Sequence, residues 1–308
     1  MSLAAPVRDR ASDLTYAAGW AAVQRLPEPA ARLLFEKVAD AAYRRNGSGV
    51  RRLRGNLAHV LAQGPSGPPS DSEVDRVCHA AMRSYLRYWL EAFRLPTWSP
   101  KEVTSRMVVH GYDHLAEAIG EGRGVVVVTG HLGNWDHVAA WAATQGIAVT
   151  TVAERLKPES LYERFVAYRE SLGMEVLPLT GDADLTAVLL KRLNEGRVLA
   201  LVADRDLSQS AIDVRFLGRP ARMPGGPAAL ALRADSVLMP LSSWYDGAHT
   251  HMRLHPRLVK PAGLRFRDAV PQLTQQFADV IGTAILEHPA DWHMLQRIWA
   301  VDDERAAA

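Results

Sequence analysis

Residues 125–128 are four consecutive valines, and this run constrains the fold more than any other feature of the chain. β-branched residues are stiff at χ1 and favour strands, and a short unbroken apolar run is typical of a strand that is buried on both faces. Such strands occur in parallel sheets that helices cover on both sides. The run therefore predicts a central strand of an α/β sheet.

The rest of the chain after about residue 122 alternates between strand and helix patterns. The predicted strands are 124–129, 148–153, 175–178, 198–203 and 237–243. The predicted helices are 134–145, 158–172, 182–195, 225–234 and 267–287. Because strands separated by helical segments form parallel βαβ units, we predict an α/β fold with a central, largely parallel sheet flanked by helices. A hairpin-like pair is expected within 237–259, and an aromatic segment at 291–299.

An N-terminal helical layer is expected before this core. Residues 1–64 show apolar positions at helical spacing, and the Gly- and Pro-rich residues 64–70 form a loop. Ser70 or Asp71 then caps a helix that carries Tyr85, Trp89 and Phe93. We expect a single domain over residues 1–308, with amphipathic helices in 1–64 and the α/β core in 65–300.

Composition excludes several classes of protein. The net charge of +2 is too small to indicate a nucleic-acid partner, and Cys78 is the only cysteine, so a disulfide framework or a cysteine metal site is excluded. Residues 1–30 lack a signal-peptide core, and no stretch reaches the roughly 20 apolar residues that span a bilayer. A cluster of arginines nevertheless suits contact with anionic lipid: Arg44, Arg45, Arg51, Arg52 and Arg54. We expect a cytoplasmic chain that lies on the membrane through residues 1–64.

Residues 129–136 (Thr-Gly-His-Leu-Gly-Asn-Trp-Asp) follow the valine run and carry the strongest chemical signal. Asn134 is a good N-cap for the next helix. His131 thus lies at the carboxyl end of a buried strand beside a helix N-terminus, where open α/β sheets place their chemistry. The pattern predicts that His131 is a general base.

Two carboxylates are candidates for orienting His131. Asp136 converges on it if His131 lies in the turn and Asp136 in the first helical turn; otherwise Asp136 only complements the helix dipole. Asp204 ends the buried strand 198–203, and a neighbouring parallel strand would bring it close to His131. A carboxylate on the far imidazole nitrogen holds the tautomer and raises its basicity. Both alternatives remain open, and Asp206 is taken as structural.

Six arginines and one lysine follow several predicted strands and suit a phosphorylated substrate, because the guanidinium of arginine binds phosphate bidentately. Each of them is alternatively a solvated surface residue. The positions are Arg155, Lys157, Arg164, Arg169, Arg205, Arg222 and Arg233.

Other catalytic classes lack their markers. The sequence has no Gly-x-Ser-x-Gly elbow, P-loop or His-Glu-x-x-His, so covalent serine catalysis and nucleotide hydrolysis lose their usual signals. His249, His251 and His255 share parity on a predicted strand and would allow a metal hydrolase, but no acid or cysteine cluster accompanies them. We therefore expect no metal and no bound cofactor.

Six runs together resemble the lysophospholipid acyltransferase superfamily, and within its lipid A late-acyltransferase branch the actinobacterial phosphatidylinositol mannoside acyltransferases. These are residues 130–136 (Gly-His-x4-Asp), 152–162, 168–173, 203–207 (Ala-Asp-Arg-Asp-Leu), 222–228 and 292–299. The resemblance spans about residues 10–300.

The resemblance implies an acyl-CoA-dependent O-acyltransferase that moves a palmitoyl-like chain to a mannose hydroxyl without an acyl-enzyme. It implies His131 as the base with Asp136 as the family's acid, and it leaves Asp204 as an alternative. Arg169 matches a basic position near the site, and Ser210 and Arg233 fall in segments bordering the CoA arm. Partners would be acyl-CoA, a glycophospholipid and the cytoplasmic face of the plasma membrane.

Two alternatives stay open. In the first, the chain is an acyltransferase whose acceptor is another glycolipid or a lysophospholipid. In the second, the chain is a non-catalytic lipid-binding protein at the membrane surface. Helix 71–95 and the valine strand are expected to line an apolar slot for the acyl chain, although their side chains are equally compatible with ordinary core.

Overall fold

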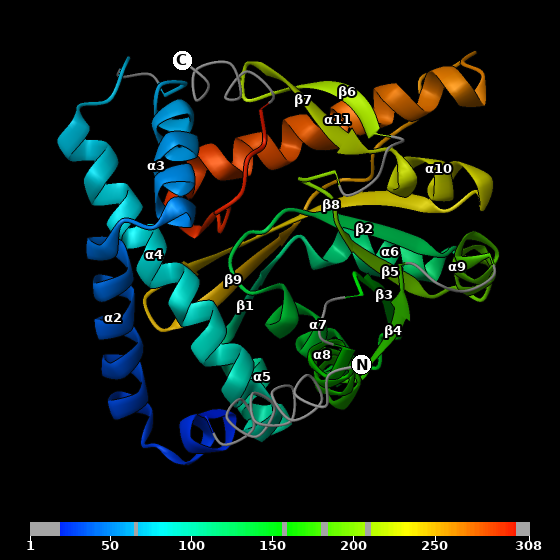
Figure 1. Cartoon of the computed structure of the whole chain (residues 1–308). Coiled ribbons are helices and arrows are strands. Elements are labelled where there is room, and N and C mark those ends of the chain that lie inside the picture. Colours follow the sequence, from blue (N-terminus) through cyan, green and yellow to red (C-terminus); the bar gives the residue numbers. More distant parts are fainter. Residues whose placement is uncertain (1–18, 65–66, 156–158, 180–183, 207–210, 300–308) are drawn as a thin grey trace, which may run out of the picture.

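The computed structural model describes residues 19–64, 67–155, 159–179, 184–206 and 211–299 (Figure 1). Its centre is a seven-stranded sheet in the order β1-β9-β8-β2-β5-β3-β4. The strands are β1 (Met107–His110), β2 (Val125–Thr129), β3 (Val149–Ala153), β4 (Met174–Pro178), β5 (Val198–Val202), β8 (Val237–Asp246) and β9 (His249–Leu254). All neighbours pair in parallel except the β8–β9 hairpin. The predicted strands, the hairpin and the parallel sheet are confirmed.

Helices cover both faces of this sheet (Figure 1). They are α5 (Pro100–Ser105), α6 (Tyr112–Gly120), α7 (Trp135–Thr144), α8 (Glu159–Ser171), α9 (Leu185–Asn194), α10 (Gly226–Arg233) and α11 (Phe266–Glu287). On β2 the side chains alternate: Val126 and Val128 pack in the core that contains α9, α10 and α11, whereas Val125 and Val127 pack in the core that contains α7 and α8. The valine run is buried on both faces, as predicted.

The N-terminal layer consists of α2 (Glu28–Arg45), α3 (Ser48–Leu61) and the long α4 (Asp71–Arg94). α2 and α3 both pack against α4 (Figure 1). Ser70 is the N-cap of α4, because its hydroxyl accepts the Glu73 amide. Asn56 on α3 donates to the carbonyls of Met294 and Gln296, at 2.9 Å each, and so fastens the C-terminal segment to this layer. Within the described ranges, no helix has both the length and the apolarity needed to cross a bilayer.

Three strands, β1, β6 (Ala211–Phe216) and β7 (Arg219–Pro224), and the short helices α5 and α6 were not predicted. Residues 211–224, which were expected only to lead into a helix, form the antiparallel hairpin of β6 and β7. β1 is short, and Pro220 and Pro224 interrupt the pattern of β7, so neither shows a clear strand periodicity. The hairpin packs against α11. These contacts stabilise β6 and β7, although the sequence of the hairpin shows no clear strand pattern.

Candidate active site

The turn between β2 and α7 positions His131. Asn134 accepts a hydrogen bond from the His137 amide at 2.9 Å, which confirms it as the N-cap of α7. Gly133 has φ +54°, and a Cβ there would lie 2.7 Å from the carbonyl oxygen of Ser243. At Gly130 a Cβ would lie 3.0 Å from the Asp204 carboxylate. The two glycines therefore let the turn pass closely between β8 and Asp204.

The carboxylate of Asp204 holds His131. β2 and β5 are paired neighbours, with Thr129 opposite Val202, so the residues that follow each strand meet at the sheet edge. The His131 Nδ1 lies 2.6 Å from Asp204 Oδ1, and the His131 amide donates to Oδ2 at 2.9 Å. Trp292 Nε1 also donates to Oδ2 at 2.9 Å. Because an ionised carboxylate only accepts, Nδ1 carries the proton and Nε2 presents its lone pair.

Asp204 is fully buried while the side chain of His131 is 31 % exposed. Burial alone raises the pKa of the Asp204 carboxyl, but the charge of His131 and the hydrogen bonds from His131 and Trp292 outweigh it, and the pKa lies below its usual value. Asp204 is therefore an anion at neutral pH, and it stabilises a proton on the imidazole.

Asp136 has other partners. Tyr88 donates to its Oδ2 at 2.8 Å, and Arg169 Nε donates to its Oδ1 at 2.9 Å. The hydrogen bond to His131 thus comes from Asp204 rather than Asp136, because Asp136 lies inside the first turn of α7 and faces α4 and α8. Burial works against the charge of Arg169, but the Asp136 carboxylate raises the pKa of its guanidinium above the usual value. Arg169 is a fixed cation.

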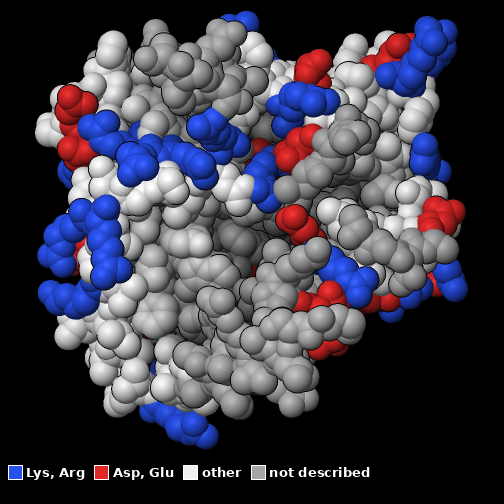
Figure 2. Space-filling model, viewed as in Figure 1, with Lys and Arg blue, Asp and Glu red and all other residues white. Residues whose placement is uncertain are grey.

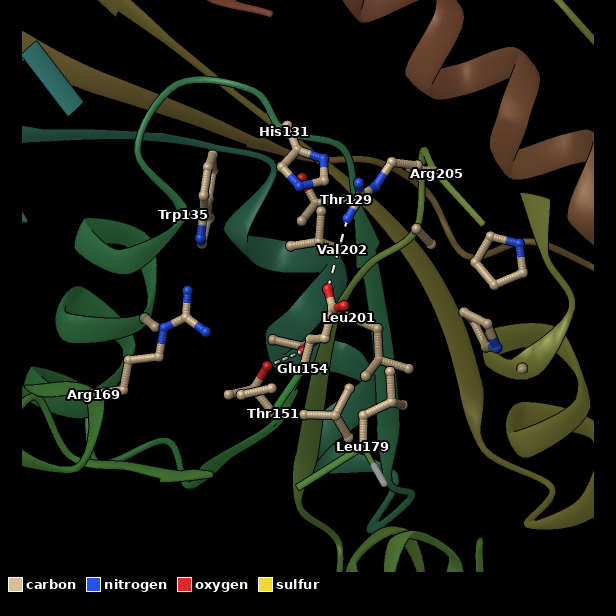
Figure 3. Close-up of a pocket in the computed structure, with 18 of the residues that line it drawn as sticks. Thr129, His131, Trp135, Thr151, Glu154, Arg169, Leu179, Leu201, Val202 and Arg205 are labelled. Carbon is tan, nitrogen blue, oxygen red and sulfur yellow. Dashed lines mark hydrogen bonds and ion pairs between the residues drawn. The ribbon is translucent and has the colours of Figure 1, made fainter. Parts of the chain in front are cut away.

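A cavity of about 650 Å³ opens at His131. It crosses the ends of β2, β5, β3 and β4 in turn, and Figure 3 shows His131 at one end of this row and Leu179 at the other. Trp135 and Arg169 flank it on one side and Arg205 on another (Figure 3). The floor is mostly aliphatic.

The helix α4 contributes part of the expected lining. Tyr85 and Trp89 line the cavity, whereas Phe93 packs 4.8 Å from Trp20 between ring centroids, away from it. The valines of β2 lie beneath the floor and only Thr129 of that strand reaches the lining. β5, β3 and β4 supply the apolar surface instead, because the cavity follows the sheet edge rather than one strand.

The arginines divide between cavity and surface. Arg169, Arg205 and Arg233 line the cavity. Arg205 lies 3.9 Å from Glu154, and Arg233 stacks over Phe266 at 5.3 Å. The half-buried Arg164 is not part of the lining, and Arg155 and Arg222 pair with Glu159 and Asp213 near the surface. Ser210 and Lys157 lie outside the described residues.

His251 on β9 and His255 just after it have partners away from the cavity. His255 Nε2 contacts the Ser242 hydroxyl at 3.0 Å, and His251 Nδ1 contacts His110 Nε2 at 3.2 Å. In the part of the chain that the structure describes, no group of three or more His, Cys, Asp or Glu side chains is arranged to hold a metal. The metal-hydrolase alternative therefore has no geometric support there.

Sequence reasoning missed Tyr88, Trp292 and His293 as parts of the site. Tyr88 shares a helix face with Tyr85 and Trp89. Trp292 and His293 belong to the aromatic segment 291–299, which contributed to the resemblance but had no predicted role at the site. An unusual density of Trp and His at a chain end was the available signal.

A histidine fixed by a buried carboxylate at the mouth of an apolar cavity, on an α/β sheet, fits an acyl-transferring enzyme. The chain belongs to the bacterial lipid A biosynthesis acyltransferase family, whose profile matches residues 6–300, and it is an acyltransferase.

Two relatives are similar over nearly their whole length. A phosphatidylinositol mannoside acyltransferase from Mycolicibacterium smegmatis is 44% identical over 305 residues, covering 98% of this chain and 96% of the relative. A second, from Mycobacterium tuberculosis strain H37Rv, is 44% identical over 295 residues, covering 95% and 90%. The resemblance inferred from the sequence motifs is confirmed.

Proposed function

We propose that this acyltransferase moves a long fatty acyl chain from acyl-CoA to a mannose hydroxyl of a phosphatidylinositol mannoside, with His131 as general base. The pairing of His131 with the buried Asp204 carries the proposal, because it leaves Nε2 basic and directed away from Asp204. The names of the relatives support the acceptor class.

The reaction then needs no covalent enzyme intermediate. The acceptor oxygen attacks the thioester carbonyl while its proton passes to His131 Nε2. The tetrahedral intermediate collapses by breaking the C–S bond, and the imidazolium returns its proton to the leaving thiolate. Asp204 stabilises the imidazolium between the two transfers.

Arg169 is the group that we assign to the oxyanion. Its Nε is occupied by Asp136, which holds the guanidinium in place, and the side chain lines the cavity near Trp135 (Figure 3). A preorganised cation in a largely apolar site stabilises developing negative charge without reorganising. Asp136 thus acts through Arg169 in this proposal, not through His131.

The apolar floor would take the acyl chain. Four neighbouring strands spaced by about 4.8 Å give a floor of roughly 14 Å from β2 to β4. Leu201 and Val202 of β5, Val152 of β3 and Leu179 after β4 lie along this path. Arg205 and Arg233 are assigned to the phosphates of CoA, for which their planar forks are suited.

Contact with the membrane is assigned to α2. Leu33, Leu34 and Val38 are 56%, 47% and 46% exposed on one side of this helix, an unusual density of apolar side chains facing solvent. Exposed basic residues follow at the α2–α3 junction (Arg44, Arg45, Arg51 and Arg52), whereas Arg54 pairs with Asp71 and Asp75. Figure 2 shows basic side chains gathered on the side of the molecule where α2 and α3 lie. This combination suits the anionic cytoplasmic face of the plasma membrane.

The decisive experiment compares the wild type with His131→Ala. Each is incubated with palmitoyl-CoA and purified phosphatidylinositol mannoside, and the product is identified by mass spectrometry. We expect the variant to lose about 10²–10⁴ in rate with an unchanged circular dichroism spectrum. His249→Ala, on the exposed end of β9, is the matched control.

Near-normal turnover by His131→Ala would remove the general-base assignment. Absence of product from the wild type would remove the acceptor assignment, and binding of mannoside without product would favour the lipid-binding alternative.

A further inference from the structure

A second imidazole stands beside His131. An antiparallel bridge joins Leu132 to Trp292, and the His293 amide donates to the His131 carbonyl at 2.8 Å. The Gly133 amide donates to the Asp291 carbonyl at 3.0 Å. The C-terminal segment is therefore fastened along the catalytic turn, and His293 lines the same cavity as His131 although it is only 5% exposed.

The tautomer of His293 follows from its neighbours. The Ser84 hydroxyl donates to Asp291 Oδ1 at 2.5 Å, and the Tyr245 amide donates to Oδ2 at 3.0 Å. Burial holds the pKa of the Asp291 carboxyl above its usual value, although these two hydrogen bonds act in the opposite direction. A hydroxyl has one proton, so Ser84 must accept from His293 Nε2 at 2.9 Å. His293 Nδ1 is then left with a lone pair.

That lone pair has no partner. Among the described residues, His293 Nδ1 is a buried atom without a hydrogen bond. Burial and the proximity of His131 lower the pKa of His293 to about 3, so the ring stays neutral and Nδ1 remains an acceptor.

The neighbouring Trp135 offers the complementary group. Its indole Nε1–H is also buried without a partner among the described residues. The Trp135 ring lies 6.4 Å from the ring of His293 and 5.6 Å from that of His131, between centroids. A buried donor or acceptor that is left unpaired destabilises the structure, so a ligand that pairs with both groups gains binding free energy.

We propose that His293 Nδ1 and Trp135 Nε1 bind hydroxyl groups of the acceptor next to the hydroxyl that reacts, and so select a sugar. His293 Nδ1 accepts a hydrogen bond from one hydroxyl, and Trp135 Nε1 donates a hydrogen bond to the oxygen of another. This inference rests on the proposed acyl transfer and narrows its acceptor: a polyhydroxylated ring satisfies both groups, whereas a lysophospholipid with a single free hydroxyl leaves them unpaired. His293 and Trp135 are then positioning residues that aim the reacting oxygen at the thioester.

The test is a cycle between enzyme variants and acceptor analogues. Wild type, His293→Phe and Trp135→Phe are assayed with the parent mannoside and with analogues in which single mannose hydroxyls are replaced by hydrogen or by fluorine. His255→Phe, the same substitution outside the cavity, is the control.

We expect the wild type to lose about tenfold in kcat/KM on one deoxy analogue, as for loss of one buried hydrogen bond. His293→Phe should lose about tenfold on the parent and no longer distinguish it from that analogue, with the KM for acyl-CoA unchanged. The fluoro analogue should behave like the deoxy analogue at the His293 position, because fluorine cannot donate.

The inference would be overturned if the wild type and the variants lost the same factor in kcat/KM on every analogue. It would also be overturned if the analogue with fluorine in place of the hydroxyl assigned to His293 reacted like the parent mannoside. If His293→Phe does not fold, Trp135→Phe carries the test with a second hydroxyl. A wild type that acylates no mannoside at all would instead overturn the proposed function, so the two failures are distinct.

Discussion

At the residue scale, the site depends on where each imidazole keeps its proton. Asp204 fixes the proton of His131 on Nδ1, and Ser84 fixes the proton of His293 on Nε2. Both rings line the cavity and each keeps one nitrogen without a proton, but only His131 is hydrogen-bonded directly to a carboxylate. In the proposed mechanism, this difference makes His131 the general base and leaves His293 a neutral hydrogen-bond acceptor.

Asp204→Asn tests the first of these pairs. The amide can donate to Nδ1 and favour the wrong tautomer, so we expect kcat to fall by about 10²–10⁴ while the KM for acyl-CoA changes little. Steady-state kinetics measure the effect. Asp136→Asn, equally buried, is the comparison: it should act through Arg169 and affect the rate without releasing His131. If Asp204→Asn kept the kcat of the wild type, the proposal that Asp204 orients His131 and stabilises its imidazolium would be contradicted.

At the element scale, the turn between β2 and α7 illustrates what the sequence predicts well. Four valines, two glycines and an N-capping asparagine are local signals, and strand, turn and helix appear as expected. β1 and the β6–β7 hairpin were missed because their stability comes from β9 and α11, which are distant in sequence.

Gly133→Ala measures how tightly the turn between β2 and α7 is packed, and Gly146→Ala, after the end of α7, is the control. Both positions have positive φ, +54° and +73°, so alanine is strained at each by roughly 1–2 kcal/mol. Nothing lies within 4 Å of a Cβ at Gly146, whereas at Gly133 the backbone of Ser243 lies 2.7 Å away. We expect Gly133→Ala to lose clearly more free energy of unfolding in urea. Equal losses of unfolding free energy in the two variants would show that the backbone of β8 moves away from the introduced methyl group at little cost.

At the scale of the whole molecule, buried histidines couple stability to pH. His137 and His293 both have a pKa lowered chiefly by burial, to about 3 for His293. An unfolded histidine titrates near 6.5, so between about pH 6.5 and 3 the unfolded chain binds more protons than the folded one. Because of His293, stability falls by up to about 1.4 kcal/mol per pH unit as the pH falls through this window, and His137 acts in the same direction.

The pH dependence is measured by urea unfolding between about pH 7.5 and about pH 5, a range that brackets the pKa of a histidine in the unfolded chain. His293→Phe should reduce the slope, and His249→Phe, at an exposed position, should leave it unchanged. If the unfolding free energy of all three proteins changed equally with pH, the proposal that buried His293 couples stability to pH would be refuted.

Membrane contact also belongs to the whole molecule. Leu33→Ser with Val38→Ser should weaken binding to anionic vesicles by about tenfold or more, since each loses apolar area that would enter the interface. Val259→Ser with Leu286→Ser, which alters exposed apolar side chains elsewhere, is the matched control. Co-sedimentation with vesicles measures both. Equal binding by the two double variants would exclude α2 as the contact.

The sequence by itself determined the βαβ alternation, the buried valine strand and the placement of His131 after it, because these depend on side-chain periodicity and on neighbours within a few residues. Only the tertiary structure decided between Asp136 and Asp204, and only it joined Ser84, Asp291 and His293 to the site. Strand order and chain crossing bring those residues together over separations of up to about two hundred positions, and single-sequence periodicity carries no information about which strands become neighbours.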